Sequence, residues 1–212
     1  IRGYGRSTKM TEPFPLNDMC DDVVGVMSDL GLTRAVLGGC SVGSGTALLL
    51  ALDHPELFDA LFLVGGNSGA SSRYQRRIDG YVSDLPSYHI KHMRELVSDT
   101  FAESERGAHL LNMFAERGPR LKGDAIAQVF AAGNSTATTE RLPEMKVPTL
   151  VINGEYDHSL PAGQRTADLI PNAEHKILPG TGHACCIENP AAFNSLVLTF
   201  LRAQGLIAEL RE

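Results

Sequence analysis

The chain has 212 residues, of which 43% are hydrophobic and 21% are charged, and this composition is typical of a folded globular protein. Its formal net charge of −6 disfavours general binding to nucleic acid. No apolar run approaches the length of a membrane span, and residues 1–5 lack the charged-then-apolar layout of a signal peptide. We therefore expect a cytoplasmic protein whose partners include neither nucleic acid nor a membrane.

The first part of the chain alternates helices and strands. Residues 16–30 carry apolar side chains at helical spacing, and residues 34–38 form a short apolar run typical of a buried strand. Residues 42–54 are predicted to form a helix that Pro55 stops, and the next strand is predicted at 60–64.

The middle of the chain, from Gly65 to about Met145, follows a different pattern. No convincing strand is found there, and amphipathic helices are predicted at 73–82, 89–101, 103–117 and 121–132. Because this segment interrupts the alternation of strands and helices, we interpret it as an inserted helical cap.

The last part of the chain returns to the alternation. Strands are predicted at 148–152 and 174–178, and helices at 164–170 and 190–204. Apolar strands separated by helices indicate a parallel sheet covered on both faces, whose ligands bind beyond the carboxyl ends of the strands. We expect core segments at 1–65 and 146–212, with the helical cap at 66–145 between them.

The pentapeptide Gly-Cys-Ser-Val-Gly at 39–43 lies between a predicted strand and a predicted helix. This arrangement fits a nucleophile elbow, in which a strained serine stands at the positive end of a helix dipole. Ser41 is then the nucleophile, and the backbone N–H of Val42 is one oxyanion donor. Cys40 is rejected as the nucleophile, because shifting the frame places Val42 where the second glycine is needed.

Two later strand ends carry the groups that a serine nucleophile requires. Asp157 follows the strand at 148–152, and His183 follows the strand at 174–178. A histidine can take the proton of Ser41 near neutral pH, and an acid can hold its imidazole in the correct tautomer. The order serine, acid, histidine therefore predicts a triad, with Glu155 as the rival acid and His158 as the rival base.

The four cysteines, Cys20, Cys40, Cys185 and Cys186, lack the paired spacing of a zinc site. Cys185 and Cys186 are adjacent, and such a pair can form a bridge only with strain. We expect reduced thiols in a cytoplasmic protein, with no metal and no organic cofactor.

On these motifs the chain resembles an α/β-hydrolase of the esterase, lactonase and carbon–carbon hydrolase group. Arg-Gly-Tyr-Gly-Arg-Ser at 2–7 is similar to the loop after the family's fourth strand, and residues 39–43 match its elbow. The acid and base loops of the family resemble the segments around Asp157 and His183, the latter extending to Pro190. The resemblance implies the α/β-hydrolase fold, with the family's fifth to eighth strands flanked by helices and an inserted cap.

One departure from the family concerns the strands that precede residues 2–7. Neither these strands nor the loop that supplies a second oxyanion N–H has a counterpart here, and the strand at 34–38 would be an uncovered apolar edge. We therefore expect the chain to be the C-terminal portion of a longer enzyme. The partner that covers the edge would be the missing N-terminal segment or a second copy in a homodimer.

The expected function is hydrolysis of small-molecule carboxylic esters or lactones through an acyl-enzyme. The alternatives are hydrolysis of a carbon–carbon bond or an enol-lactone in aromatic breakdown, acyl transfer to an alcohol, and a receptor that binds ligands without turnover. Apolar side chains of the cap suggest a hydrophobic group on the substrate, although at helical spacing they more often form the cap's own core: Met93, Leu110, Met113 and Phe114.

Overall fold

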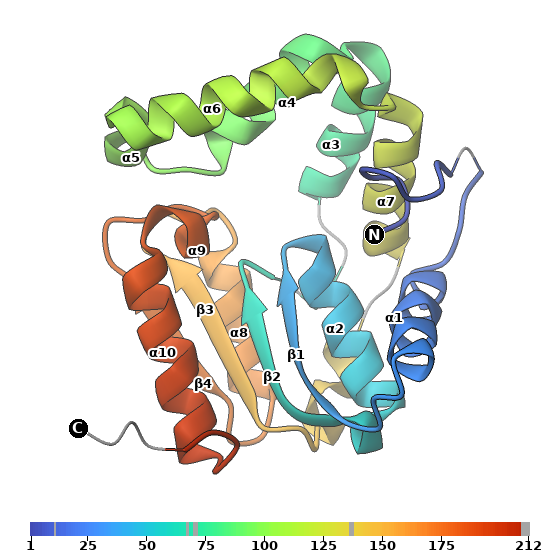
Figure 1. The fold of residues 1–212 in the computed structure, drawn as a ribbon, viewed down its shortest axis with the longest axis vertical. Helices are drawn as coiled ribbons and strands as arrows, with labels where there is room; N and C mark the ends of the chain where they lie inside the picture. Colours follow the sequence, from blue (N-terminus) through green and yellow to red (C-terminus); the bar gives the residue numbers. More distant parts are fainter. Residues whose placement is uncertain (11, 67, 70–71, 136–137, 209–212) are drawn as a thin grey trace.

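The computed structural model describes residues 1–10, 12–66, 68–69, 72–135 and 138–208. Within these ranges the chain forms a four-stranded parallel sheet in the order β1-β2-β3-β4, with helices on both faces (Figure 1). The strands are β1 (Ala35–Cys40), β2 (Phe58–Val64), β3 (Thr149–Gly154) and β4 (Glu174–Leu178). The predicted parallel sheet is confirmed, and each predicted strand matches to within two residues.

The two faces of the sheet bury separate apolar cores, because alternate strand residues point to opposite sides. Leu61 and Leu63 of β2 face a core shared with α2 (Val42–Asp53) and α8 (Leu160–Leu169). Ala60 and Val64 face the opposite core. That core is covered by α10 (Pro190–Ala203) and the short α9 (Cys185–Glu188), while α1 (Asn17–Asp29) packs on α2.

A layer of helices lies beyond the carboxyl ends of the strands (Figure 1). This helical layer consists of α3 (Ser72–Ser83), α4 (Leu85–Glu95), α5 (Asp99–Glu103), α6 (Glu105–Arg117) and α7 (Gly123–Ser135). Between 66 and 145 the described residues include no strand. Short 3₁₀ turns complete the element order: η1 (Pro55–Leu57), η2 (Gly118–Arg120) and η3 (Thr139–Glu144).

Two predicted helices differ from those observed. The continuous helix expected at 89–101 is wrong, because α4 ends at Glu95 and α5 begins at Asp99. Ser98 separates them: its backbone is extended, and its Oγ accepts the N–H of Phe101 at 3.2 Å as a helix cap. The helix expected at 164–170 begins earlier, at Leu160, with a proline in its first turn.

The strand β1 lies at an edge of the sheet, paired only with β2 among the residues that the structure describes (Figure 1). Val36 on this strand is 38% exposed, and the large apolar residues Val26, Leu30 and Leu32, which precede it in the sequence, are also exposed. The prediction of an exposed apolar edge strand is therefore confirmed. In the described part of the chain, no helix is both long enough and apolar enough to cross a bilayer.

Candidate active site

Ser41 occupies the turn between β1 and α2 in a conformation that few residues other than glycine adopt. Its φ is 56° and its ψ is −119°, in the left-handed half of backbone space. The backbone N–H of Ser41 donates to the carbonyl of Val64 at 2.8 Å, which holds the turn against β2. The backbone is strained and fixed at the residue predicted to be the nucleophile.

The turn requires glycine on one side of Ser41 only. A Cβ at Gly39 would lie 2.4 Å from the carbonyl oxygen of Gly43, so a side chain cannot fit there. The corresponding position at Gly43 faces open space, so a side chain would have room there. The hydroxyl of Ser44 lies 2.9 Å from the carbonyl of Gly39 and 3.1 Å from that of Val64, which further ties the turn to β2.

Val42 is the first residue of α2. The first N–H groups of a helix have no partner within it, and the helix dipole makes this end favourable for negative charge. The amide of Val42 thus lies beside Ser41 at an end suited to an anion.

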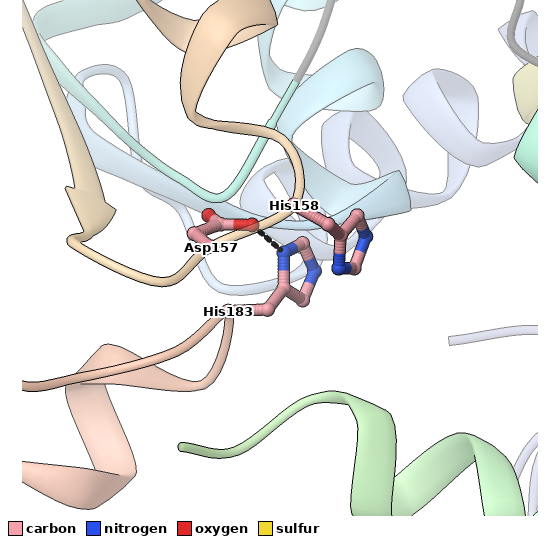
Figure 2. Close-up of side chains that lie close together, drawn as sticks. All are labelled: Asp157, His158 and His183. Carbon is pink, nitrogen blue, oxygen red and sulfur yellow. Dashed lines mark hydrogen bonds and ion pairs between the residues drawn. The ribbon is translucent and has the colours of Figure 1, made fainter. Parts of the chain in front are cut away.

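Asp157 and His183 meet in the interior, although 26 residues separate them in sequence. The Nδ1 atom of His183 lies 2.9 Å from Oδ1 of Asp157, and the two side chains are 5% and 0% exposed (Figure 2). This hydrogen bond occupies Nδ1 and leaves Nε2 of the imidazole for proton transfer. The structure therefore brings together the predicted acid and the predicted base.

Two residues that the sequence analysis did not identify hold the Asp157 carboxylate. Ser159 donates its N–H to Oδ1 at 2.7 Å and its hydroxyl lies within 2.9 Å of both oxygens, while the Asn153 amide donates to Oδ2 at 2.8 Å. Burial favours the neutral acid, but the hydrogen bond and charge of His183 and these donors outweigh it and hold the pKa of Asp157 below its usual value. A serine two residues after an aspartate was a usable signal, because it forms an Asx-turn.

Glu155, the rival acid, and His158, the rival base, do not form the hydrogen bond that joins Asp157 to His183. Glu155 accepts the N–H of Gly180 at 2.8 Å, an exposed contact away from the imidazole. The ring of His158 stacks on that of His183, with centroids 4.6 Å apart and planes at 16° (Figure 2). Burial, and then the nearby charge of His183, lowers the pKa of His158 to about 4. His158 is therefore a neutral ring packed against that of His183 near pH 7.

Asp157, His158 and His183 also form the kind of cluster that can hold a metal ion, with one ligand atom from each within 4.8 Å of the others. The arrangement does not suit that role. The carboxylate of Asp157 is already engaged by several donors, and nearly parallel stacked rings direct their nitrogens alongside one another rather than toward one point. The cluster fits an oriented imidazole better than a metal centre.

Ser41 and His183 line the same cavity, whose volume is about 410 Å³. The end of β2 connects them: Val64 binds the N–H of Ser41, and the His183 ring lies so close to Gly65 that a Cβ there would be 2.6 Å from its Cε1. No direct hydrogen bond joins Ser41 to His183 among the described residues. The two side chains therefore share one cavity but are not hydrogen-bonded to each other.

The wall opposite the sheet comes from the helical layer. Its apolar and aromatic members are Tyr74 of α3, Leu96 after α4 and Phe130 of α7, joined by the buried His92. The four apolar residues weighed as substrate contacts, with the cap's own core as the commoner alternative, are not among those that line this cavity in the described chain: Met93, Leu110, Met113 and Phe114. Helical spacing identified apolar faces, but it could not show which face is turned toward the sheet.

Glu188 joins the loop of His183 to the helical layer. Its Oε1 accepts the N–H of Gly182 at 2.8 Å, and its Oε2 accepts the N–H and the hydroxyl of Ser98 at 3.1 and 2.6 Å. The N–H of Ala184 also donates to the carbonyl of Leu96 at 2.7 Å. The backbone after His183 is thereby bonded directly to the helical layer, and the backbone before it is linked to that layer through Glu188.

The parallel sheet, the serine at a strained strand-to-helix turn and the buried Asp–His pair are the features of a hydrolase built on an α/β sheet. Residues 1–190 match the family described as the alpha/beta hydrolase fold. The chain belongs to this family and is a hydrolase.

Relatives and solved structures are similar over nearly the whole chain. RutD of Caulobacter sp. (strain K31), named as a candidate carbamate hydrolase, is 31% identical over 96% of this chain and 79% of its own length. A 2-hydroxy-6-oxononadienedioate/2-hydroxy-6-oxononatrienedioate hydrolase of Paraburkholderia phymatum is 30% identical over 94% and 73%. A hydrolase from Pseudomonas aeruginosa superimposes with a TM-score of 0.85 at 26% identity, over 94% of this chain and 77% of that one.

Proposed function

We propose that the protein is a serine hydrolase that cleaves carboxylic esters or lactones through an acyl-enzyme. The observation that supports this most is the buried 2.9 Å pair of Asp157 and His183, which shares one cavity with the strained Ser41. A serine hydroxyl is a weak nucleophile until a base takes its proton, and an oriented imidazole is such a base.

In this proposal His183 takes the proton of Ser41 as the hydroxyl attacks the substrate carbonyl. The carbonyl oxygen becomes an oxyanion, and collapse of the intermediate expels the alcohol, which receives the proton from His183. A water molecule activated by His183 then releases the acid from Ser41. Asp157 stays ionised throughout and stabilises the imidazolium, in keeping with its lowered pKa.

The backbone N–H of Val42 is the proposed oxyanion donor, because it lies at the start of α2 beside Ser41. One such donor contributes about 3 kcal/mol to transition-state stabilisation. We further propose that residues 66–145 act as a cap over core segments 1–65 and 146–212, since α3, α4 and α7 contribute to the cavity wall. Free thiols at all four cysteines fit the proposed cytoplasmic location.

A fluorophosphonate probe tests the nucleophile. We expect rapid covalent labelling of the wild-type protein and none of the Ser41→Ala variant, together with turnover of short and medium p-nitrophenyl esters or of simple lactones. Cys40→Ser is the matched control, because it changes the adjacent residue and should still be labelled. Labelling that persists in Ser41→Ala would contradict the proposal, and tight ligand binding without labelling would indicate a binding protein instead.

Hydrolysis of a carbon–carbon bond next to a ketone is the second candidate. The Paraburkholderia phymatum relative named for that reaction favours it, and the same three side chains can serve both reactions. Comparing kcat/KM for 2-hydroxy-6-oxononadienedioate, followed by loss of its absorbance, with kcat/KM for esters distinguishes the candidates. A higher kcat/KM of the wild-type protein for 2-hydroxy-6-oxononadienedioate than for esters would favour carbon–carbon bond hydrolysis.

A further inference from the structure

The cavity that contains Ser41 and His183 is lined by cationic side chains. Arg73, Arg77 and Arg165 all contribute to its wall, whereas no aspartate or glutamate does so among the described residues. The arginines come from two layers, since Arg73 and Arg77 belong to α3 and Arg165 belongs to α8. A cavity with one sign of charge on two walls attracts ligands of the opposite charge.

Two histidines of the cavity, His92 and His158, do not supply this charge. Burial lowers the pKa of His92 to about 2, and burial together with His183 lowers the pKa of His158 to about 4. Both rings are therefore neutral near pH 7, and the positive charge comes from the arginines.

The three arginines differ in how they are held. Arg77 is buried, and its guanidinium donates to Glu95 at 2.7 Å and to Tyr88 at 3.3 Å, so its charge is compensated within the helical layer. Arg73 is exposed and donates to the backbone carbonyl of His158, beside the base.

Arg165 has no acidic side chain within 4 Å in the described chain. It is exposed on α8, where Pro161, Arg165 and Leu169 follow one another at intervals of four residues and all line the cavity. One stripe of this helix therefore faces the cavity, and Arg165 is its only charged member. Arg165 therefore contributes a cationic side chain without an acidic partner to the wall of the cavity.

We propose that the cavity binds acyl substrates that carry a second, ionised carboxylate, and that Arg165 pairs with this carboxylate while Arg73 adds positive charge from the opposite layer. The inference rests on the proposed serine hydrolysis and specifies the substrate class of that site. A guanidinium suits this ligand because its planar set of donors matches the two oxygens of a carboxylate.

Two p-nitrophenyl esters with six-carbon acyl chains provide the test: mono-p-nitrophenyl adipate, which carries a free carboxylate, and p-nitrophenyl hexanoate, which does not. We expect the wild-type protein to have the higher kcat/KM for the adipate monoester. We expect added NaCl to reduce that preference, because salt screens a partly exposed ion pair.

Variants of Arg165 locate the effect. Arg165→Gln should lower kcat/KM for the adipate monoester about tenfold and change that for the hexanoate ester less than about twofold. Arg165→Lys should retain part of the preference. Arg34→Gln is the matched control, because it removes the same charge near the amino end of β1, where Arg34 pairs with Asp59 at 2.6 Å, and should leave both values unchanged.

The outcomes separate this inference from the proposed function. Equal use of the two esters, or equal losses on both in Arg165→Gln, would overturn the carboxylate site while leaving serine hydrolysis intact. If neither ester is cleaved and the phosphonate does not label Ser41, the proposed function fails. Calorimetry on Ser41→Ala then still decides the inference, since monomethyl adipate should bind more tightly than methyl hexanoate, and Arg165→Gln should abolish the difference.

Discussion

Replacing Gly65 with alanine should disturb the Asp157–His183 pair directly. Gly65 follows β2 with φ at 58°, and a Cβ there would lie 2.6 Å from Cε1 and 2.7 Å from Nδ1 of His183. The same atom would be 3.2 Å from an oxygen of Asp157. The imidazole must shift to admit the methyl group, because contacts this short are repulsive.

The expected effect has two parts. Placing a non-glycine residue in left-handed backbone costs about 1–2 kcal/mol, and crowding a packed interior adds about 1–3 kcal/mol. In a protein of this size, each kcal/mol lowers Tm by about 2–4 °C. A reactive group displaced by about 1 Å costs about 10²-fold in rate, and we expect a loss of that order in kcat/KM for Gly65→Ala.

Gly31→Ala separates strain from crowding. Gly31 has a φ of 67° with nothing within 4 Å of its would-be Cβ, so alanine there incurs the backbone cost alone. The assay is ester hydrolysis together with urea unfolding of both variants. Gly31→Ala should lose stability and keep wild-type kcat/KM. Wild-type activity in Gly65→Ala would refute the reasoning, because the alanine Cβ would then not displace the His183 imidazole enough to slow the reaction.

Three further predictions concern His183 and the groups around it. His183→Ala should lower kcat by about 10³-fold or more, while circular dichroism shows that the fold is retained. His158→Ala should lower kcat by about tenfold at most, because only His183 is hydrogen-bonded to Asp157. A larger loss in His158→Ala than in His183→Ala would assign the base to His158. Asp157→Asn should reduce the free energy of unfolding most at pH 7 and progressively less below about pH 4. The reason is that a carboxyl whose pKa is lowered in the folded state stabilises the fold above its unfolded pKa, and this contribution is lost as the pH falls. Urea titrations that show the same difference at every pH would contradict this. Glu188→Ala should lower stability by about 1–3 kcal/mol and should also lower kcat/KM, because the N–H groups of Gly182 and Ser98 lose their acceptor. Glu155→Ala removes one exposed hydrogen bond and should be close to wild type in both measurements. Equal effects of the two substitutions would contradict the role assigned to Glu188.

The features that sequence alone predicted are those that short-range patterns encode. Apolar runs and turn residues within about ten positions identified the four strands, and glycines around Ser41 identified the turn on which it lies. Asp157 and His183 could be named because parallel strands place their carboxyl ends together, so residues that follow different strands meet at one edge.

Tertiary structure decided what depends on side-chain direction. His158 is adjacent to Asp157 in sequence, yet its ring stacks on His183 rather than pairing with the acid, and nothing local distinguishes these arrangements. Asn153 and Arg165 acquire their significance only when β3 and α8 are in place. A sequence pattern specifies which residues share a face of one element, whereas the neighbour that this face meets is set by packing between elements distant in the chain.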